Sequence, residues 1–169
     1  MAPDKGILRR MHDSSIPVAI VMQRRDLHNR WQSEAWEPLG VVLNHVSGGE
    51  PSRLVEEGGI TQWLFPGFEL RLFRDETEGY YLNVSSNEPR IFVMWRMDAG
   101  LAVPQFVTVS YNEAGRLMDG GEQVDTVPMP AEVMAWVGGY VEEHYRPERK
   151  RRNRPQSFQS PKDRAGKPS

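Results

Sequence analysis

Apolar and polar residues alternate over several short stretches of the chain, which is the pattern of strands that bury one face. The clearest example is 68–74, where Phe68, Leu70 and Leu72 fall on one side and charged residues on the other. Similar stretches, some apolar on both sides, predict six further strands: 16–25, 36–46, 80–86, 90–97, 105–111 and 122–127.

The apolar spacing changes after Pro128 from a period of two to steps of three, four and seven, which indicates one face of a helix over about 130–146. This face carries seven large side chains: Val133, Met134, Trp136, Val137, Tyr140, Val141 and Tyr145. Glycine, proline and charged residues mark the segments between strands, so we expect loops at 47–59 and 112–121.

Six or seven antiparallel strands followed by one amphipathic C-terminal helix predict a mainly β (α+β) fold. Two architectures fit the pattern. One is a pleckstrin-homology-like barrel with the helix at an open end, and the other is a sheet with the helix across one face. The strand count favours the barrel. We expect a flexible leader at 1–15, a single domain at 16–146 and a disordered basic tail at 147–169.

The composition excludes cysteine chemistry and indicates the cellular location of the protein. The chain has no cysteine, so disulfides and thiolate chemistry are excluded. The N-terminus lacks a continuous apolar segment, and no stretch is apolar for the ~18 residues that cross a membrane. We therefore expect a cytoplasmic protein that does not enter the membrane.

Charge is divided unevenly along the chain, although its formal net charge is only −2. From Arg146 onward there are nine basic and two acidic residues, which leaves 12 basic and 21 acidic residues for the rest. A tail of +7 therefore follows a body of −9. Two interpretations of the tail are open: a solubilising segment, or one that binds an acidic protein or a nucleic acid. Phosphate would be repelled by the acidic body, so nucleic acid is the less favoured partner.

The sequence offers no catalytic or cofactor signature. None of the four histidines lies three or four residues from another, and no HExxH, GxSxG, Walker A or GxGxxG pattern occurs. We expect no cofactor and no metal, and enzymatic activity has no support. A small ligand held in the mouth of a barrel is a further alternative.

Two tryptophans stand close together between the first two predicted strands. Trp36 opens the second strand and is interpreted as part of the core. Trp31 lies in a polar connection between Arg30 and Gln32, where two interpretations are open: a lid over the core, or the centre of a protein interface. The candidate partner-binding residues combine this region with the tail: Arg24, Arg25, Arg30, Trp31, Gln32, Arg149, Lys150, Arg151, Arg152 and Arg154.

The segment "IPVAIVMQRRDLHNRWQSEAWEPLGVV" resembles the opening motif of an uncharacterised proteobacterial domain-of-unknown-function family. Its marks are a valine-rich strand, the basic pair, Arg-Trp-Gln and a second tryptophan. The resemblance extends over 16–148. Genes of that family lie beside those of molybdenum- or tungsten-dependent formate dehydrogenases and their maturation factors. The resemblance therefore implies a non-catalytic accessory protein with a partner in that system, and it supplies no catalytic residues.

Overall fold

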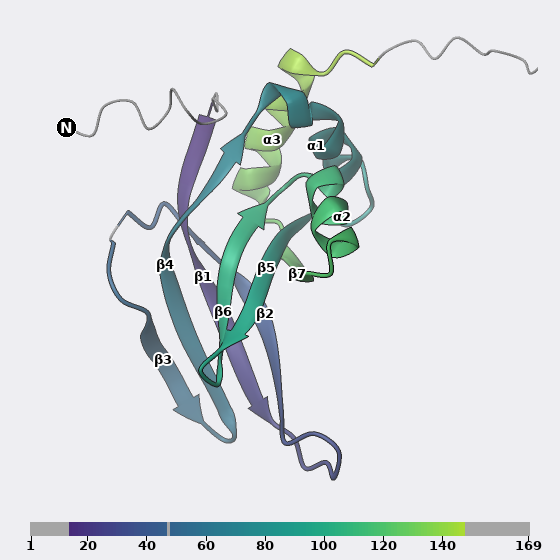
Figure 1. Ribbon diagram of the computed structural model, residues 1–169. Helices are drawn as coiled ribbons and strands as arrows, with labels where there is room; N and C mark the ends of the chain where they lie inside the picture. Colours follow the sequence, from purple (N-terminus) through teal and green to yellow (C-terminus); the bar gives the residue numbers. More distant parts are fainter. Residues whose placement is uncertain (1–13, 47, 148–169) are drawn as a thin grey trace, which may run out of the picture.

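The computed structural model describes residues 14–46 and 48–147. They form two antiparallel sheets and three α-helices (Figure 1). Each sheet comes from a separate part of the chain: the first from Ser14–Leu72 and the second from Arg90–Pro128.

The first sheet contains β1 (Ser14–Asp26), β2 (Glu34–Leu43), β3 (Ser52–Glu57) and β4 (Ile60–Leu72). Their order is β2-β1-β4-β3, and every pairing is antiparallel. β3 pairs with β4 only as far as Leu64, so the rest of β4 is paired on one side alone.

The second sheet has the order β6-β5-β7, with β5 (Arg90–Asp98) in its centre. β6 (Leu101–Thr108) follows through a tight turn, and β7 (Gln123–Pro128) completes the other edge. Ala99 and Gly100 adopt positive φ in this turn. Glycine tolerates that conformation without strain.

Three helices and one short 3₁₀ turn connect or follow the strands. The turn η1 (Arg74–Glu76) leads into α1 (Thr77–Val84), while α2 (Tyr111–Asp119) joins β6 to β7. The last described helix is α3 (Ala131–His144). Figure 1 shows α1 and α3 together at the end of the sheets where β4 finishes, with α2 beside β5 and β7.

The core lies between the two sheets and α3. Side chains from alternate positions of the strands meet there, since one face of each strand is turned inward. Its fully buried members include Val18, Ile20, Met22, Leu70, Leu72, Ile91, Val93, Val127, Val133 and Val137. Val18, Ile20 and Met22 alternate along 16–25, and Leu70 and Leu72 lie on the expected apolar side of 68–74. Strand β5 differs, because it is buried on both faces from Ile91 to Trp95 and Met97 is half exposed.

Four sequence predictions about the architecture are wrong. The two sheets do not close into a barrel, and the pleckstrin-homology-like arrangement that rested on a barrel stays unconfirmed. The described residues hold three helices rather than one. Residues 80–86, predicted as a strand, belong mostly to α1, and the loop expected at 112–121 is largely α2.

Conversely, part of the loop expected at 47–59 is a strand. All six residues of β3 are exposed at the edge of the first sheet, so no buried face produces an alternating pattern. The glycines Gly58 and Gly59 that suggested a loop form the turn to β4, where both adopt positive φ.

Buried polar side chains join the helices to the second sheet. Asn83 on α1 donates from Nδ2 to the carbonyl oxygens of Arg90 (2.7 Å) and Val109 (2.9 Å), and its Oδ1 accepts from the Arg90 N–H (2.9 Å). Nearby, Ser110 Oγ donates to the buried Glu76 carboxylate at 2.6 Å. Arg116 on α2 forms an ion pair with the same carboxylate. Hydrogen bonds of this kind compensate the cost of burying polar groups.

Candidate functional site

The end of the first sheet farthest from α1 and α3 consists of two hairpin tips (Figure 1). Residues 27–33 connect β1 to β2, and the Gly58–Gly59 turn connects β3 to β4. The Asp26 N–H donates to the Gly59 carbonyl oxygen at 2.8 Å, which holds the two tips side by side. Within the longer tip, the Leu27 N–H donates to the Ser33 carbonyl oxygen at 2.9 Å. These bonds fix where the β1–β2 tip begins and ends.

Trp31 projects from the β1–β2 tip, and 85% of its surface is exposed. Its backbone N–H donates to Asn29 Oδ1 at 2.8 Å, a local bond that shapes the turn without covering the indole. Its neighbours Arg30 and Gln32 are exposed as well. The lid interpretation of Trp31 is therefore wrong, because a lid would be covered by the core. Exposed tryptophan beside arginine is typical of protein interfaces.

The basic pair Arg24 and Arg25 lies in β1 rather than in the tip. Arg24 forms ion pairs with Asp26 (3.2 Å) and Glu34 (3.6 Å). Arg25 Nε lies 3.1 Å from Glu37 Oε1. Because the two residues are consecutive in a strand, they occupy opposite faces of the sheet, and each has acidic partners within this chain.

Arg30 differs from these two arginines. Across residues 14–46 and 48–147, no ion pair or side-chain hydrogen bond involves its guanidinium. The structure thus brings Arg30, Trp31 and Gln32 together at one exposed tip. We call these three residues the Trp31 tip.

Trp36 packs against the core, as the sequence indicated. Its ring lies beside that of Trp63, with ring centroids 5.2 Å apart, and its Nε1 donates to Glu34 Oε1 at 3.2 Å. The two tryptophans of this region therefore do different work: Trp36 stabilises the sheet, and Trp31 faces the solvent.

This difference gives a direct test of stability. We expect Trp36→Ala to lower the free energy of unfolding by about 2–3 kcal/mol, since it removes a partly buried indole and leaves space beside Trp63. Trp31→Ala should change it by less than about 0.5 kcal/mol, because an exposed side chain loses little on truncation. Denaturant titrations followed by far-UV circular dichroism measure both. Equal losses for the two variants would contradict the assignment of Trp31 to the surface.

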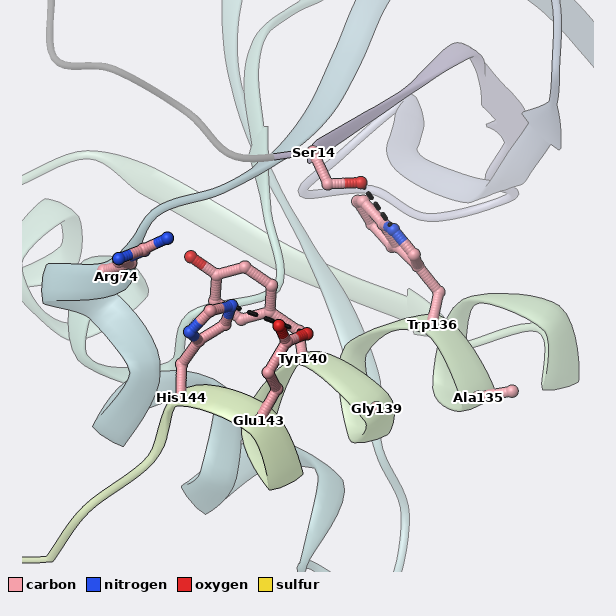
Figure 2. A pocket seen from close by; sticks show the side chains of 8 residues that line it. All are labelled: Ser14, Arg74, Ala135, Trp136, Gly139, Tyr140, Glu143 and His144. Carbon is pink, nitrogen blue, oxygen red and sulfur yellow. Dashed lines mark hydrogen bonds and ion pairs between the residues drawn. The ribbon is translucent and has the colours of Figure 1, made fainter.

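A separate hollow of about 650 Å³ lies between α3, Ser14 and Arg74 (Figure 2). Trp136 Nε1 donates to Ser14 Oγ at 2.8 Å, and the His144 ring lies 4.4 Å from the Tyr140 ring. In Figure 2, Arg74 and the tip of Tyr140 point toward each other across this hollow. Its polar groups mainly tie α3 to the start of β1. This site could not be predicted from the sequence, because its members come from three distant segments.

No group of three or more His, Cys, Asp or Glu residues in the described part of the chain is placed to hold a metal ion. Among the same residues, no helix is long and apolar enough to cross a membrane. The tail residues Arg149, Lys150, Arg151, Arg152 and Arg154 lie outside the described residues. Their role, and the nucleic-acid alternative that rests on it, stay predictions.

The fold and the tip define a small domain of two antiparallel sheets, three helices and one prominent exposed tryptophan. Comparison with family models places the chain more specifically. It belongs to the family described as "Protein of unknown function (DUF3305)", whose model matches residues 17–154. This agrees with the domain-of-unknown-function resemblance over 16–148. No curated protein and no solved structure matches the chain.

Proposed function

We propose that this protein is a non-catalytic accessory protein that binds a protein partner through the Trp31 tip. The observation that carries the proposal is the 85% exposure of Trp31 on a tip held by backbone hydrogen bonds. An indole kept in water offers a large apolar area that a partner can bury, and tryptophan is enriched among residues that dominate binding energy. The adjacent Arg30 supplies a charge that is not used within the described chain.

The partner we propose is a formate dehydrogenase or one of its maturation factors. This part of the proposal is supported by the family resemblance, which implies that the genes lie together. The accessory protein would act during assembly, maturation or regulation of that enzyme.

Affinity purification of the tagged full-length protein from its native host tests this proposal. We expect a formate dehydrogenase subunit or maturation factor to be recovered with the unmodified protein. Trp31→Ala should reduce its recovery at least about tenfold, as expected for an interface residue worth more than about 1.4 kcal/mol. Arg30→Ala should weaken capture less than Trp31→Ala does. The effect of Arg30→Ala should be larger at low ionic strength than at high ionic strength.

Met118→Ala is the matched control, because Met118 is a large apolar side chain that is 50% exposed on α2, away from the tip. Its capture should equal that of the unmodified protein. The proposal fails if no such component is recovered and deletion of the gene leaves formate oxidation intact.

A further inference from the structure

The outer edge of β3 is open to a further strand. Figure 1 shows β3 as the outermost strand of the first sheet, and among the described residues β4 is the only strand that pairs with it. All six of its residues are exposed. Every second residue of an edge strand directs its backbone N–H and C=O groups outward, where another strand can form hydrogen bonds with them.

Two apolar side chains occupy the middle of this edge. Leu54 is 49% exposed and Val55 is 40% exposed. They are adjacent at the point where the register between β3 and β4 shifts, since Leu54 is the extra residue between Arg53 and Val55. An open edge with apolar residues at its centre favours association with another chain.

Arg53 and Glu56 flank the two apolar residues and form an ion pair at 2.6 Å. Arg53 lies opposite Trp63 and Glu56 lies opposite Thr61, so both charged side chains are on the same face of the sheet. They are 57% and 63% exposed. An exposed ion pair contributes little to stability by itself, and its charges stay accessible to further charges in solution.

The order of residues in β3 is self-complementary for antiparallel pairing. When a second β3 runs antiparallel with its Val55 opposite Leu54, each Arg53 faces the Glu56 of the other copy. The four charges then alternate in sign, so each copy keeps its own ion pair and two pairs between the copies are added. Opposite charges and apolar pairs directly across two strands stabilise a sheet.

Other ways of pairing two β3 strands are less favourable. Parallel pairing in register places Arg53 opposite Arg53 and Glu56 opposite Glu56, and like charges directly opposite each other are destabilising. An antiparallel register shifted by one residue still gives Arg53 an acidic partner in Glu57, but it sets Leu54 opposite Glu56. A second copy of this chain in one antiparallel register is therefore the occupant that matches the edge.

We infer that two copies of this protein associate through antiparallel pairing of their β3 strands, which joins the two first sheets into one. The contact is isologous, because the same six residues serve on both sides. Pro51, which has no N–H to donate, and the positive-φ Gly58 limit the paired segment to β3.

This inference goes beyond the proposed function, because the Trp31 tip takes no part in the contact. The tip lies beside the Gly58–Gly59 turn at one end of β3. Antiparallel pairing places the two copies of this turn at opposite ends of the joined strands. A dimer of this kind would present two separate Trp31 tips and could hold two partner molecules.

Sedimentation velocity of the full-length protein from about 10 μM to about 1 mM tests the inference, since a contact of six paired residues on each side is expected to be weak. The mean mass of the unmodified protein should rise with concentration. Arg53→Glu and Glu56→Arg each set like charges opposite one another, so each should raise the dissociation constant at least about tenfold.

Arg96→Glu is the matched control for this charge change. Arg96 on β5 is 57% exposed, as Arg53 is, and it also forms an ion pair, with Glu122. The control should associate as strongly as the unmodified protein. An unmodified protein that stays monomeric at the highest concentration would overturn the inference, and so would equal weakening by Arg96→Glu and Arg53→Glu.

An equimolar mixture of Arg53→Glu and Glu56→Arg gives the sharper result. In the heterodimer every like-charge contact becomes an opposite-charge contact, so the mixture should associate at least about tenfold more tightly than either variant alone. The double variant, in which both charges are exchanged, should regain self-association. A mixture that associates no more tightly than its two components would contradict the inferred register.

Disulfide trapping measures the direction of the strands, because the chain contains no cysteine. The inferred register sets Ser52 opposite Glu57 of the other copy, about 4.5–5.5 Å apart between Cα atoms, which a disulfide can span. Mixed Ser52→Cys and Glu57→Cys variants should therefore crosslink under mild oxidation. Ser52→Cys alone should not, since the two copies of this position are about 17 Å apart. Faster crosslinking of Ser52→Cys with itself than in the mixture would indicate parallel pairing and overturn the inference.

The two proposals can fail separately. Trp31→Ala should lose capture of the formate dehydrogenase component yet still self-associate, and Arg53→Glu should show the reverse. If Arg53→Glu associates as strongly as the unmodified protein while Trp31→Ala loses capture, only the β3 inference fails. If Trp31→Ala retains both properties, only the assignment of the partner to the Trp31 tip fails.

Discussion

Asn83→Ala is expected to lower the free energy of unfolding by about 3–5 kcal/mol, because each buried polar group left without a partner costs about 1–3 kcal/mol. The side chain is 2% exposed and serves three backbone groups. Its removal would leave the Arg90 N–H and the carbonyl oxygens of Arg90 and Val109 without their side-chain partner. Chemical denaturation followed by tryptophan fluorescence measures the loss.

Asn87→Ala is the matched control, since Asn87 follows α1 and is exposed. It should change stability by less than about 0.5 kcal/mol. A loss below about 1 kcal/mol for Asn83→Ala would mean that water replaces the amide at this junction.

Gly79→Ala is expected to cost about 2–4 kcal/mol, through overpacking and the disturbance of a buried hydrogen bond. An added Cβ would overlap with Ser110 Oγ and lie 3.1 Å from Ser110 Cβ and 3.2 Å from the Asn112 backbone nitrogen. The backbone nitrogen cannot move freely, because it belongs to the first turn of α2. The melting temperature and denaturant midpoint should both fall.

Two comparisons isolate this cause. Gly139→Ala in α3 meets no atom within 4 Å and should leave the protein unchanged or more stable by up to about 1 kcal/mol, the gain in helix propensity. Measured in a Ser110→Ala background, Gly79→Ala should cost less than in the unmodified protein, because the nearest obstacle is gone. An unchanged cost in that background would refute the steric explanation.

Six of the seven strands overlap segments that the sequence predicted as strands, because those segments are apolar on one or both faces. At 90–97 the apolar run from Ile91 to Trp95 is buried on both faces, as expected for a central strand, and the pattern needed no tertiary information. The strand β3 was not predicted. It is exposed along its whole length, so its sequence shows no alternation of apolar and polar residues.

Helix α1 was misread for a different physical reason. Its buried positions are Thr77, Gly79, Tyr80 and Asn83, which carry few apolar groups. Hydrogen bonds and close approach, rather than an apolar stripe, hold this helix, so hydrophobic periodicity could not reveal it. Helix α2 did leave a signal, because Ser110 followed by Glu113 is the pattern of a capping box. The Ser110 hydroxyl accepts from the Glu113 N–H at 3.1 Å.

Part of the candidate site could be predicted from the sequence. A tryptophan among polar residues correctly drew attention to the tip, and the polar surroundings of Trp31 agree with its exposure. The pairing of Arg24 with Glu34 and of Arg25 with Glu37 depends on the register between β1 and β2. Register cannot be read from one strand, so Arg24, Arg25 and Arg30 appeared equivalent in the sequence. Of these three, only Arg30 has no ion pair among the described residues.

Because each sheet is built from its own part of the chain, every strand pairing is formed without residues from the other sheet. Each sheet can therefore assemble before the two meet, with the less local contacts made last. Trp36 and Trp63 sit in one sheet, Trp95 in the other and Trp136 in α3. Both sheets and α3 thus carry native fluorophores, and variants that retain one tryptophan at a time would report the order in which these three parts fold.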